Sequence, residues 1–351
     1  MNRVSSFLRV ILLLGLLGAS TFFFLREELI HWANRSRELP YPVVLDYPRG
    51  TSLREMSTRL ENEGLVSSNQ LFWIWARFFS QVHRFQAGTY RFSESVAPRE
   101  IAQAFINGDV YQPVVFEVTI PEGFTVSQII ERLAAKGAAP VEKLRQVAGD
   151  TDFIASLGIP STSLEGYLYP ATYPFIHHPS PEDIFRRMVS EFRERLPIDY
   201  EQRVNQLGLS LAQAITFASL IERETKQDDE RPLVSEVIWN RLNKGIALAI
   251  DASIIFGIPD FDGDIRRKHL IDRNNLYNTR VHPGLPPGPI CSPTIQSLLA
   301  VLTPTDQGLY YYVVDAENFD RHRFSKTLSE HNRYVREYLR AKKARELLNS
   351  N

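Results

Sequence analysis

The sequence of 351 residues has a single cysteine, Cys291, and its 40 Lys and Arg residues are balanced by 41 Asp and Glu residues. One cysteine excludes an intrachain disulfide, a CxxC redox motif and a zinc site built from cysteines. A formal net charge of −1 argues against a nucleic-acid-binding protein, which would show a basic face. The histidines lack a metal-binding spacing such as HExxH, so we expect no metal ion. We also expect no other cofactor, and the balanced charge predicts no nucleic-acid partner.

Charged side chains are absent from residues 10–25, an apolar run slightly shorter than the ~20 residues that span a bilayer. Arg9 and Arg26 flank this run and can reach the two membrane surfaces, which extends its usable length. We therefore predict a single transmembrane anchor over residues 8–26. The basic residues before the anchor predict a cytoplasmic tail, residues 1–7, and place the rest of the chain on the other side of the membrane.

A cleaved signal peptide is the alternative, because residues 18–20 are small enough for a cleavage site. The apolar stretch continues through residues 21–25, and this continuation favours the anchor. Both interpretations place the body of the chain across the membrane. Residues 27–42 are polar and charged and end in two prolines, so they predict a linker that precedes the first folded module.

A short pattern occurs twice in the chain, at residues 48–53 and at residues 121–126. Each copy follows a β-prone run and contains a Pro-x-Gly turn, after which a hydroxyl residue, Ser52 or Thr125, can cap a helix. A glycine then stops each helix. Two copies are too few for a solenoid, so the pattern predicts a duplicated strand–turn–helix unit.

The first copy continues with a predicted helix over residues 69–81, a strand over residues 88–92 and a helix over residues 98–107. This order over residues 43–112 resembles the small glycan-binding LysM domain, and we predict a LysM-like βααβ module. Aromatic residues at helical spacing either pack in a core or stack on sugars, and we favour the core. The aromatic residues of the first of these helices are Phe72, Trp73, Trp75, Phe78 and Phe79.

Residues 113–348 predict a second domain of mixed α/β structure. Helices are expected over residues 181–196 and 232–242, and a basic helix ends the chain. A strand over residues 309–314 is expected to pair with residues 323–325. The predicted fold class is therefore α+β, with an N-terminal transmembrane helix, the LysM-like module and this mixed domain, which carries the candidate catalytic residues.

The helix predicted from residue 210 onward carries the main catalytic candidate. Ser210 and Gln213 can form a capping box, and an apolar arc with a 3.6-residue period follows. Glu222 projects from within the arc, where loss of water favours the protonated form of a carboxyl group. A general acid needs that property. A salt bridge at the helix end is the alternative for Glu222, whereas Glu224 lies at the margin of the arc and serves a different purpose.

Several stretches of the second domain, in this order and spacing, resemble the bacterial endolytic peptidoglycan transglycosylases of the YceG-like family. They are residues 164–173, 218–225, 240–245, 251–257 and 277–290, with the late stretches 321–324 and 330–332. The similarity runs from the anchor to residue 332. Two departures exist: residues 249–253 read Ala-Ile-Asp-Ala-Ser where the family usually has Gln-Thr-Asp-Pro-Thr, and Ala171 stands where the family usually has Asp.

The resemblance implies that Glu222 is the catalytic residue of a lytic transglycosylase. Protonated Glu222 would donate to the oxygen that joins MurNAc to GlcNAc, and the carboxylate would then take the proton of the primary hydroxyl of MurNAc. The product end would be a 1,6-anhydro sugar. Substrate-binding roles are implied for the remaining candidates, each with a turn or capping role as its alternative. These candidates are Glu224, Asn240, Arg241, Asp251, Asn278, Thr279, Glu165 and Tyr167.

The resemblance also implies a single-pass protein of the bacterial inner membrane whose catalytic domain lies in the periplasm and cuts nascent strands. The implied partners are peptidoglycan glycan strands, the membrane and peptidoglycan synthases. Two other functions remain open. The departures around Asp251 suggest a catalytically silent, peptidoglycan-binding membrane anchor. A hydrolytic muramidase would need a second carboxylate, for which Asp251 is the candidate.

Overall fold

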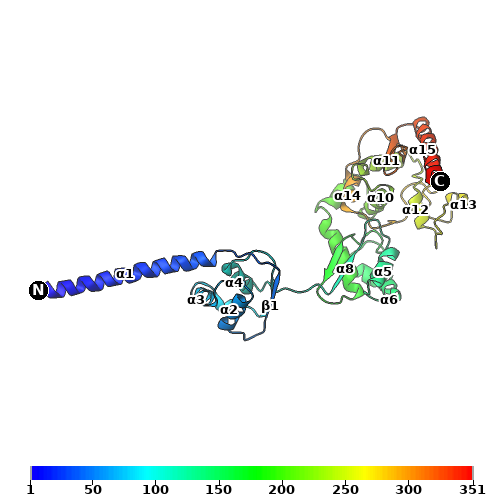
Figure 1. The fold of residues 1–351 in the computed structure, drawn as a ribbon. Helices are drawn as coiled ribbons and strands as arrows, with labels where there is room; N and C mark the ends of the chain where they lie inside the picture. Colours follow the sequence, from blue (N-terminus) through cyan, green and yellow to red (C-terminus); the bar gives the residue numbers. More distant parts are fainter. Residues whose placement is uncertain (1, 350–351) are drawn as a thin grey trace. The chain divides into compact units, whose positions relative to one another are not determined.

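The computed structural model describes the backbone of residues 2–349 and the side chains of residues 13–347. The chain folds as two compact units, Met1–Pro113 and Val114–Asn351, each with its own core (Figure 1). The cytoplasmic tail predicted for residues 1–7 falls on side chains outside the described residues, so it stays a prediction.

The first unit contains the predicted strand–helix–helix–strand order behind a long N-terminal helix. Its elements are α1 (Asn2–Ala33), β1 (Val43–Tyr47), α2 (Leu53–Asn62), α3 (Asn69–Phe79), the 3-10 turn η1 (Val82–Arg84), β2 (Gly88–Phe92) and α4 (Pro98–Asn107). β1 and β2 pair antiparallel, from Val43 opposite Phe92 to Tyr47 opposite Gly88. The predicted order of elements is confirmed, and resemblance to a LysM domain in function stays a prediction.

Aromatic side chains form the centre of the first core. The ring of Phe105 lies 4.7 Å from that of Tyr90 and 5.4 Å from that of Tyr47, between centroids. Of the five aromatic residues of α3, Phe72 and Trp75 are buried in this core. The core interpretation therefore holds for these two residues only. The other three, Trp73, Phe78 and Phe79, are exposed.

The C-terminal end of α1 belongs to the same core, whereas its middle is exposed. Ala33 is fully buried, Leu29 and Trp32 pack against the core, and Trp32 Nε1 donates a 2.8 Å hydrogen bond to Ser67 Oγ. Among the described residues, no single helix has both the length and the apolar composition of a membrane span. The helices α9 (Tyr200–Gln206) and α10 (Leu211–Glu224), bent by 91° at their junction, pass that test only as a pair.

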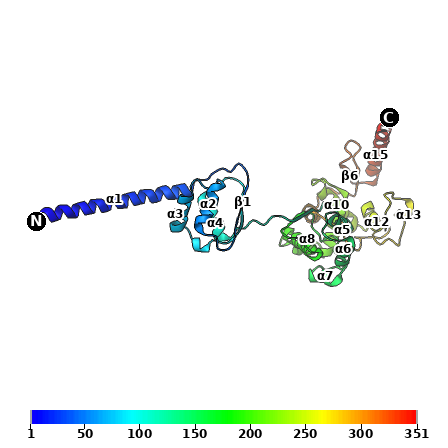
Figure 2. The same cartoon turned by 60° about the horizontal axis from the view of Figure 1, so that its bottom comes forward.

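The second unit is built around α10, which lies among other helices in both ribbon views (Figures 1 and 2). The strands of this unit are β3 (Phe116–Thr119), β4 (Thr172–Phe175), β5 (Tyr311–Val314) and β6 (His322–Ser325). Its remaining helices are α5 (Val126–Ala135), α6 (Val141–Ala148), α7 (Thr151–Ser156), α8 (Pro181–Arg195), α11 (Arg231–Asn243), α12 (Asp251–Phe256), α13 (Arg267–Leu270), α14 (Ile295–Leu302) and α15 (Leu328–Asn349).

The duplicated unit is present in both compact units with the same local devices. Ser52 caps α2 and Thr125 caps α5, each by accepting a backbone N–H three residues later. Gly50 and Gly123 precede these caps with φ of 90° and 67°, a backbone conformation that residues with a Cβ rarely adopt. The prediction of a repeated strand–turn–helix unit is therefore confirmed.

The strands of the second unit pair antiparallel and, throughout the described residues, only in twos: β3 with β4, and β5 with β6. The hairpin of β5 and β6 confirms the predicted pairing of residues 309–314 with residues 323–325. The predicted helices are present as α8, α11 and α15. β4 was not predicted, because its residues follow a turn-rich stretch and include a proline, which is unusual inside a sheet.

Candidate active site

α10 brings two carboxyl groups to the end of a largely buried helix. Ser210 caps its start, where its Oγ accepts the Gln213 amide and the Gln213 side chain accepts the Ser210 amide, as predicted. Residues 214–222 are all buried, and the helix ends at Glu224. Glu222 and Glu224 are two residues apart, so their side chains leave the helix in different directions.

Glu222 points into the protein, where four donors converge on one of its oxygens. Its Oε2 accepts from Arg231 Nη1 at 3.0 Å, from the Thr294 amide at 2.9 Å, from Thr294 Oγ1 at 2.7 Å and from Ser297 Oγ at 2.7 Å. The side chains of Glu222 and Arg231 are each only 4% exposed. The predicted burial of Glu222 is therefore confirmed, but polar donors surround its carboxyl group, and the salt bridge given as the alternative is also present.

The contacts of Glu222 join three helices. Arg231 is the first residue of α11, and Thr294 caps α14, which begins one residue later. A buried ion pair needs such additional donors, because its charges have lost their water. The arrangement supplies these donors to Glu222 and fixes the end of α10 relative to α11 and α14.

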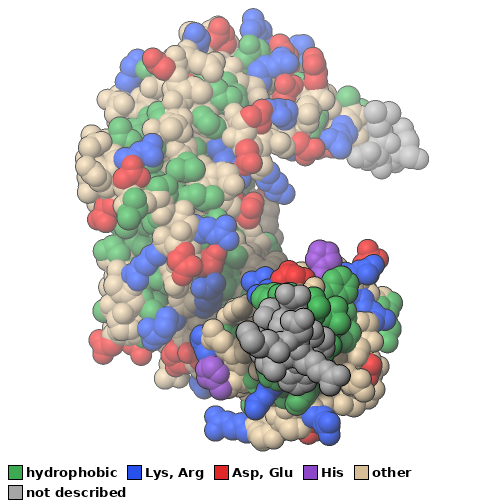
Figure 3. All heavy atoms as spheres, turned by 90° about the vertical axis from the view of Figure 1, so that its left-hand side faces the viewer, with side chains coloured by type: hydrophobic (Ala, Val, Ile, Leu, Met, Phe, Trp, Pro, Cys, Tyr) green, Lys and Arg blue, Asp and Glu red, His purple; other side chains and the backbone are tan. Residues whose placement is uncertain are grey.

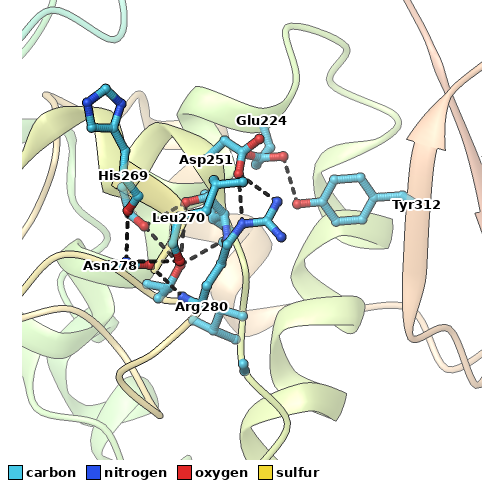
Figure 4. Close-up of polar contacts among 12 residues, drawn as sticks. Glu224, Asp251, His269, Leu270, Asn278, Arg280 and Tyr312 are labelled. Atoms are coloured by element: carbon cyan, nitrogen blue, oxygen red, sulfur yellow. Dashed lines mark hydrogen bonds and ion pairs between the residues drawn. The ribbon is translucent and has the colours of Figure 1, made fainter. Parts of the chain in front are cut away.

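Glu224 points the other way, toward the hairpin of β5 and β6, and is only partly buried. Tyr312 Oη of β5 donates a 2.7 Å hydrogen bond to Glu224 Oε2 (Figure 4). Burial raises the pKa of Glu224 above its ordinary value, the charge of Asp251 adds to this rise, and the Tyr312 hydrogen bond and His322 oppose it. Glu224 thus has the property that the sequence suggested for Glu222, a protonated form favoured by loss of water.

Asp251 and Arg280 form an ion pair near Glu224. Asp251 Oδ1 accepts from Arg280 Nη2 at 2.9 Å and from Arg280 Nε at 3.2 Å, and Figure 4 draws both contacts beside Glu224. Their side chains are 50% and 39% exposed, so both remain open to a ligand. The substrate-binding role predicted for Asp251 fits this exposure and stays a prediction.

Asn278 and Thr279 are buried and form hydrogen bonds within the second unit. Asn278 is fully buried, and its Nδ2 donates to the carbonyl oxygens of His269, Leu270 and Asp272 (Figure 4). Thr279 is 2% exposed, and its Oγ1 accepts the Ile250 amide at 2.9 Å. These hydrogen bonds fit the alternative, a turn and capping role, and substrate binding by either residue stays a prediction.

Asn240 and Arg241 hold β5 against α11. Asn240 Nδ2 donates to the Leu309 carbonyl oxygen at 2.8 Å, and Arg241 Nε donates to the Tyr310 carbonyl oxygen at 2.8 Å. Arg241 also lies over the ring of Tyr311, 5.3 Å from its centroid. These contacts position the strand that carries the partner of Glu224, and contact of either residue with a substrate stays a prediction.

Glu165 and Tyr167 are both buried in the second unit, and the substrate-binding role predicted for them stays a prediction. Glu165 is 9% exposed and accepts the Val126 amide at the start of α5, at 3.0 Å from Oε2. Burial raises the pKa of Glu165 to about 7. Tyr167 is 3% exposed, and burial raises its pKa to about 12.

The residues that distinguish the two glutamates were not predicted from the sequence. Glu222 accepts hydrogen bonds from Arg231, Thr294 and Ser297. Glu224 accepts from Tyr312, and the nearby Asp251 accepts from Arg280. The capping hydroxyl before an apolar run could have identified Thr294, but no local signal shows which glutamate it faces. Over the described residues, no group of three or more His, Cys, Asp or Glu side chains is placed to hold a metal ion.

Comparison with known proteins adds an independent line of evidence. The model of the YceG-like family matches residues 45–337. The chain is 26% identical to the endolytic murein transglycosylase of Streptococcus pneumoniae strain R6, an alignment that covers 97% of this chain but only 65% of that protein. It is 28% identical to the endolytic murein transglycosylase of Bacillus subtilis, over 86% of each chain. The crystal structure of a YceG-like protein from Listeria monocytogenes is similar with a TM-score of 0.57 and 27% identity, over 84% of this chain and 99% of that one.

Proposed function

Because the chain belongs to the YceG-like family, we propose that it is an endolytic lytic transglycosylase that cuts peptidoglycan glycan strands. The bond cleaved joins MurNAc to GlcNAc, and the product is a 1,6-anhydro-MurNAc end. The proposal extends to the whole chain what the names of the Streptococcus and Bacillus relatives state for those proteins. The observation behind the choice of residue is that Glu224, at the end of α10, is only partly buried as a residue, while burial raises the pKa of its carboxyl group.

Glu224 is the proton donor in this proposal. A general acid must touch the leaving oxygen. Glu224 is only partly buried as a residue, whereas the side chain of Glu222 is only 4% exposed. Its raised pKa increases the protonated fraction at neutral pH. Tyr312 fixes one oxygen of the group through its 2.7 Å hydrogen bond.

The proton balance needs one carboxyl group and no water. Glu224 gives its proton to the glycosidic oxygen as the bond to the anomeric carbon breaks. The carboxylate then accepts the proton of the C6 hydroxyl, whose oxygen bonds to the same anomeric carbon. The enzyme returns to its starting protonation state, so a second catalytic carboxylate is not required, in contrast to ordinary glycosidases.

Glu222 becomes a positioning residue in this proposal, because its contacts fix the end of α10 from behind. Catalysis by Glu222, the prediction from sequence, remains the competing assignment. The matched variants Glu222→Gln and Glu224→Gln separate the two. Loss of anhydro products in Glu224→Gln, with a folded protein, supports Glu224. Loss confined to Glu222→Gln, again with the fold intact, returns the role to Glu222.

We further propose that α1 anchors the chain in the bacterial inner membrane as a single span, with the N-terminus in the cytoplasm and both units outside. The exposed apolar side chains between Leu13 and Leu25 support this, because such a stretch needs an apolar environment. Cleavage would then act on nascent strands close to the membrane, where peptidoglycan synthases are the expected partners.

The first unit is proposed to bind glycan, in line with its LysM-like order of elements. A hollow of about 450 Å³ lies between the β1–α2 turn and the segment that leads into β2, with Tyr47, Arg49, Thr51, Phe85 and Gln86 in its lining. A lining that combines aromatic and polar residues suits a sugar, which presents both apolar faces and hydroxyls.

A catalytically silent anchor that binds peptidoglycan is the second candidate, favoured by the departures at residues 249–253. The experiment that decides is digestion of purified peptidoglycan by the full chain, with mass spectrometry of the fragment ends. Anhydro ends support the transglycosylase, reducing ends support a hydrolase, and uncut strands that retain bound protein support the silent anchor.

A further inference from the structure

α3 exposes a large apolar surface that the core of the first unit does not need. Phe78 is 71% exposed, Phe79 40% and Ile74 38%, although this helix also buries Phe72 and Trp75 on its other side. A helix that is apolar on both sides is unusual at the surface of a soluble domain. Exposed apolar patches of this kind mark contact with a partner or a membrane.

This surface continues onto α1. Side chains of the two helices enclose a hollow of about 440 Å³. The apolar side chains that line it are Phe22, Leu25 and Leu29 of α1 and Ile74, Phe78 and Phe79 of α3. In Figure 3, which looks along α1 from its N-terminal end, hydrophobic side chains gather around the helix and basic side chains lie at their margin.

The environment changes from apolar to polar across Ile74. On the side away from α1, Ile74 and Trp73 border a second hollow of about 450 Å³, whose other lining residues include Arg54, Asn69 and Gln70. Trp is enriched where the hydrocarbon of a bilayer meets the lipid headgroups, because its ring is apolar and its N–H is polar. The apolar hollow, then Ile74, then a polar hollow that Trp73 helps to line, follow the same gradient.

Positive charge lies at the border of the apolar surface. Arg77 is exposed on α3, and Arg26 lines the apolar hollow and pairs with Glu27. Basic side chains beside an apolar helix face favour the interface of a membrane that contains anionic lipid.

From these observations we propose that α3 inserts its Ile74–Phe78–Phe79 face into the extracytoplasmic interface of the bilayer beside α1. The inference rests on the proposed membrane anchoring of α1. Lipid is the occupant, because the α3 face and the exposed apolar stretch of α1 form one surface, and a bilayer that covers the second also covers the first. The first unit is then held on the membrane surface, and the exposed aromatic residues of α3 are not available to sugars.

The test uses the full chain in vesicles of phosphatidylethanolamine and phosphatidylglycerol, with nitroxide labels on single introduced cysteines. The native Cys291 is fully buried, and a labelled wild-type chain measures any background from it. Phe78→Cys probes the proposed contact, Phe23→Cys probes the anchor, and Val44→Cys, on an exposed position of β1 in the same unit, reports water.

Collisions with lipid-soluble oxygen and with a water-soluble nickel chelate are compared at each label. We expect the oxygen-to-nickel ratio at position 78 to resemble that at position 23 and to exceed that at position 44 by about threefold or more, as for interfacial helices. A water-like ratio at position 78 with a lipid-like ratio at position 23 overturns the inference and leaves the anchor standing.

Two other outcomes also contradict the proposal. Position 78 shielded from both reagents would mean that protein covers it, so a second copy of the chain would be the occupant. Water-like ratios at positions 23 and 78 together would show that α1 does not enter the bilayer, and both the anchoring proposal and this inference would fall. Neither result bears on cleavage, which is measured separately from product ends.

Discussion

Tyr312 donates a 2.7 Å hydrogen bond to Oε2 of Glu224, and this contact joins residues that are 88 positions apart in the chain. The two groups come from different kinds of element, a core helix and a two-stranded hairpin. The contact distinguishes the two carboxyl groups at the end of α10. Glu224 is bonded to the hairpin, whereas Glu222 faces the opposite direction and accepts from four donors.

Glu224→Gln is expected to lower the rate of anhydro-end formation by about 10²–10⁴-fold, the usual contribution of a general acid. The amide keeps the shape and can still accept from Tyr312, so the protein should fold normally. Mass spectrometry of digested peptidoglycan measures the rate, and circular dichroism checks the fold. Near-normal cleavage by this variant would remove Glu224 from the mechanism.

Glu222→Gln is expected to act mainly on stability. Removing one partner of a buried ion pair leaves the other charge without compensation, which costs roughly 3–5 kcal/mol. Arg231 is only 4% exposed, so the variant would leave its buried charge without a carboxylate partner. Urea unfolding measures the loss, and the exposed pair of Arg145 with Glu131 offers a control, since Glu131→Gln should cost less than about 1 kcal/mol. A variant as stable as the wild type would contradict the positioning role.

Tyr312→Phe should change the pH profile more than the maximal rate. The Tyr312 hydrogen bond lowers the pKa of Glu224, so its removal moves that pKa up and extends activity to higher pH. A neutral hydrogen bond contributes about 1 kcal/mol, which limits the rate change to less than about tenfold. The neighbouring variant Tyr311→Phe is the control and should leave the profile in place. A shift to lower pH in Tyr312→Phe would contradict the assignment.

Asp251→Asn separates the transglycosylase from a hydrolase. The charge of Asp251 raises the pKa of Glu224, so its loss should move the alkaline limb of activity to lower pH. The pair with Arg280 is half-exposed, and its loss should cost less than about 1 kcal/mol of stability. Anhydro ends should still form. Complete inactivity of this variant, together with reducing ends from the wild type, would instead identify a hydrolase.

Glu165 should make stability depend on pH. Its pKa is raised by burial from 4.5 to about 7, so the folded chain keeps this proton over a range in which the unfolded chain loses it. The stabilisation is complete below pH 4.5 and is lost as pH rises to about 7. The free energy of unfolding should fall by about 3 kcal/mol over this range. Unfolding of Glu165→Gln measured over this range should lack that slope, and an unchanged slope would assign it to another group.

Local features of the fold could be predicted from sequence because their causes are local. Ser52, Thr125 and Ser210 cap helices through groups three residues away, and Gly50 and Gly123 need only their own backbone freedom. The duplicated unit and the α10 helix follow from such short-range rules. β4 could not be predicted in this way, because a strand that contains a proline forms only where a distant strand, here β3, pairs with it.

The roles of the two glutamates could not be assigned from the helix alone. An apolar arc at a helical period shows that one side of α10 is buried, but not what is buried against it. Thr294 and Ser297 arrive from a segment about 70 residues away and make the surroundings of Glu222 polar. The same limit applies to Asn278, since a buried amide that holds a loop and an exposed amide that binds sugar look identical in sequence.

The hairpin of β5 and β6 has no further strand beside it within the described residues, and a lone hairpin is marginal in water. Asn240 and Arg241 of α11 hold the residues just before β5, and α15 packs against both strands. A shortened chain that stops before residue 309 would retain α10 and both its glutamates. It would lose Tyr312, and Glu224 would then have no hydrogen bond from the hairpin to fix its orientation.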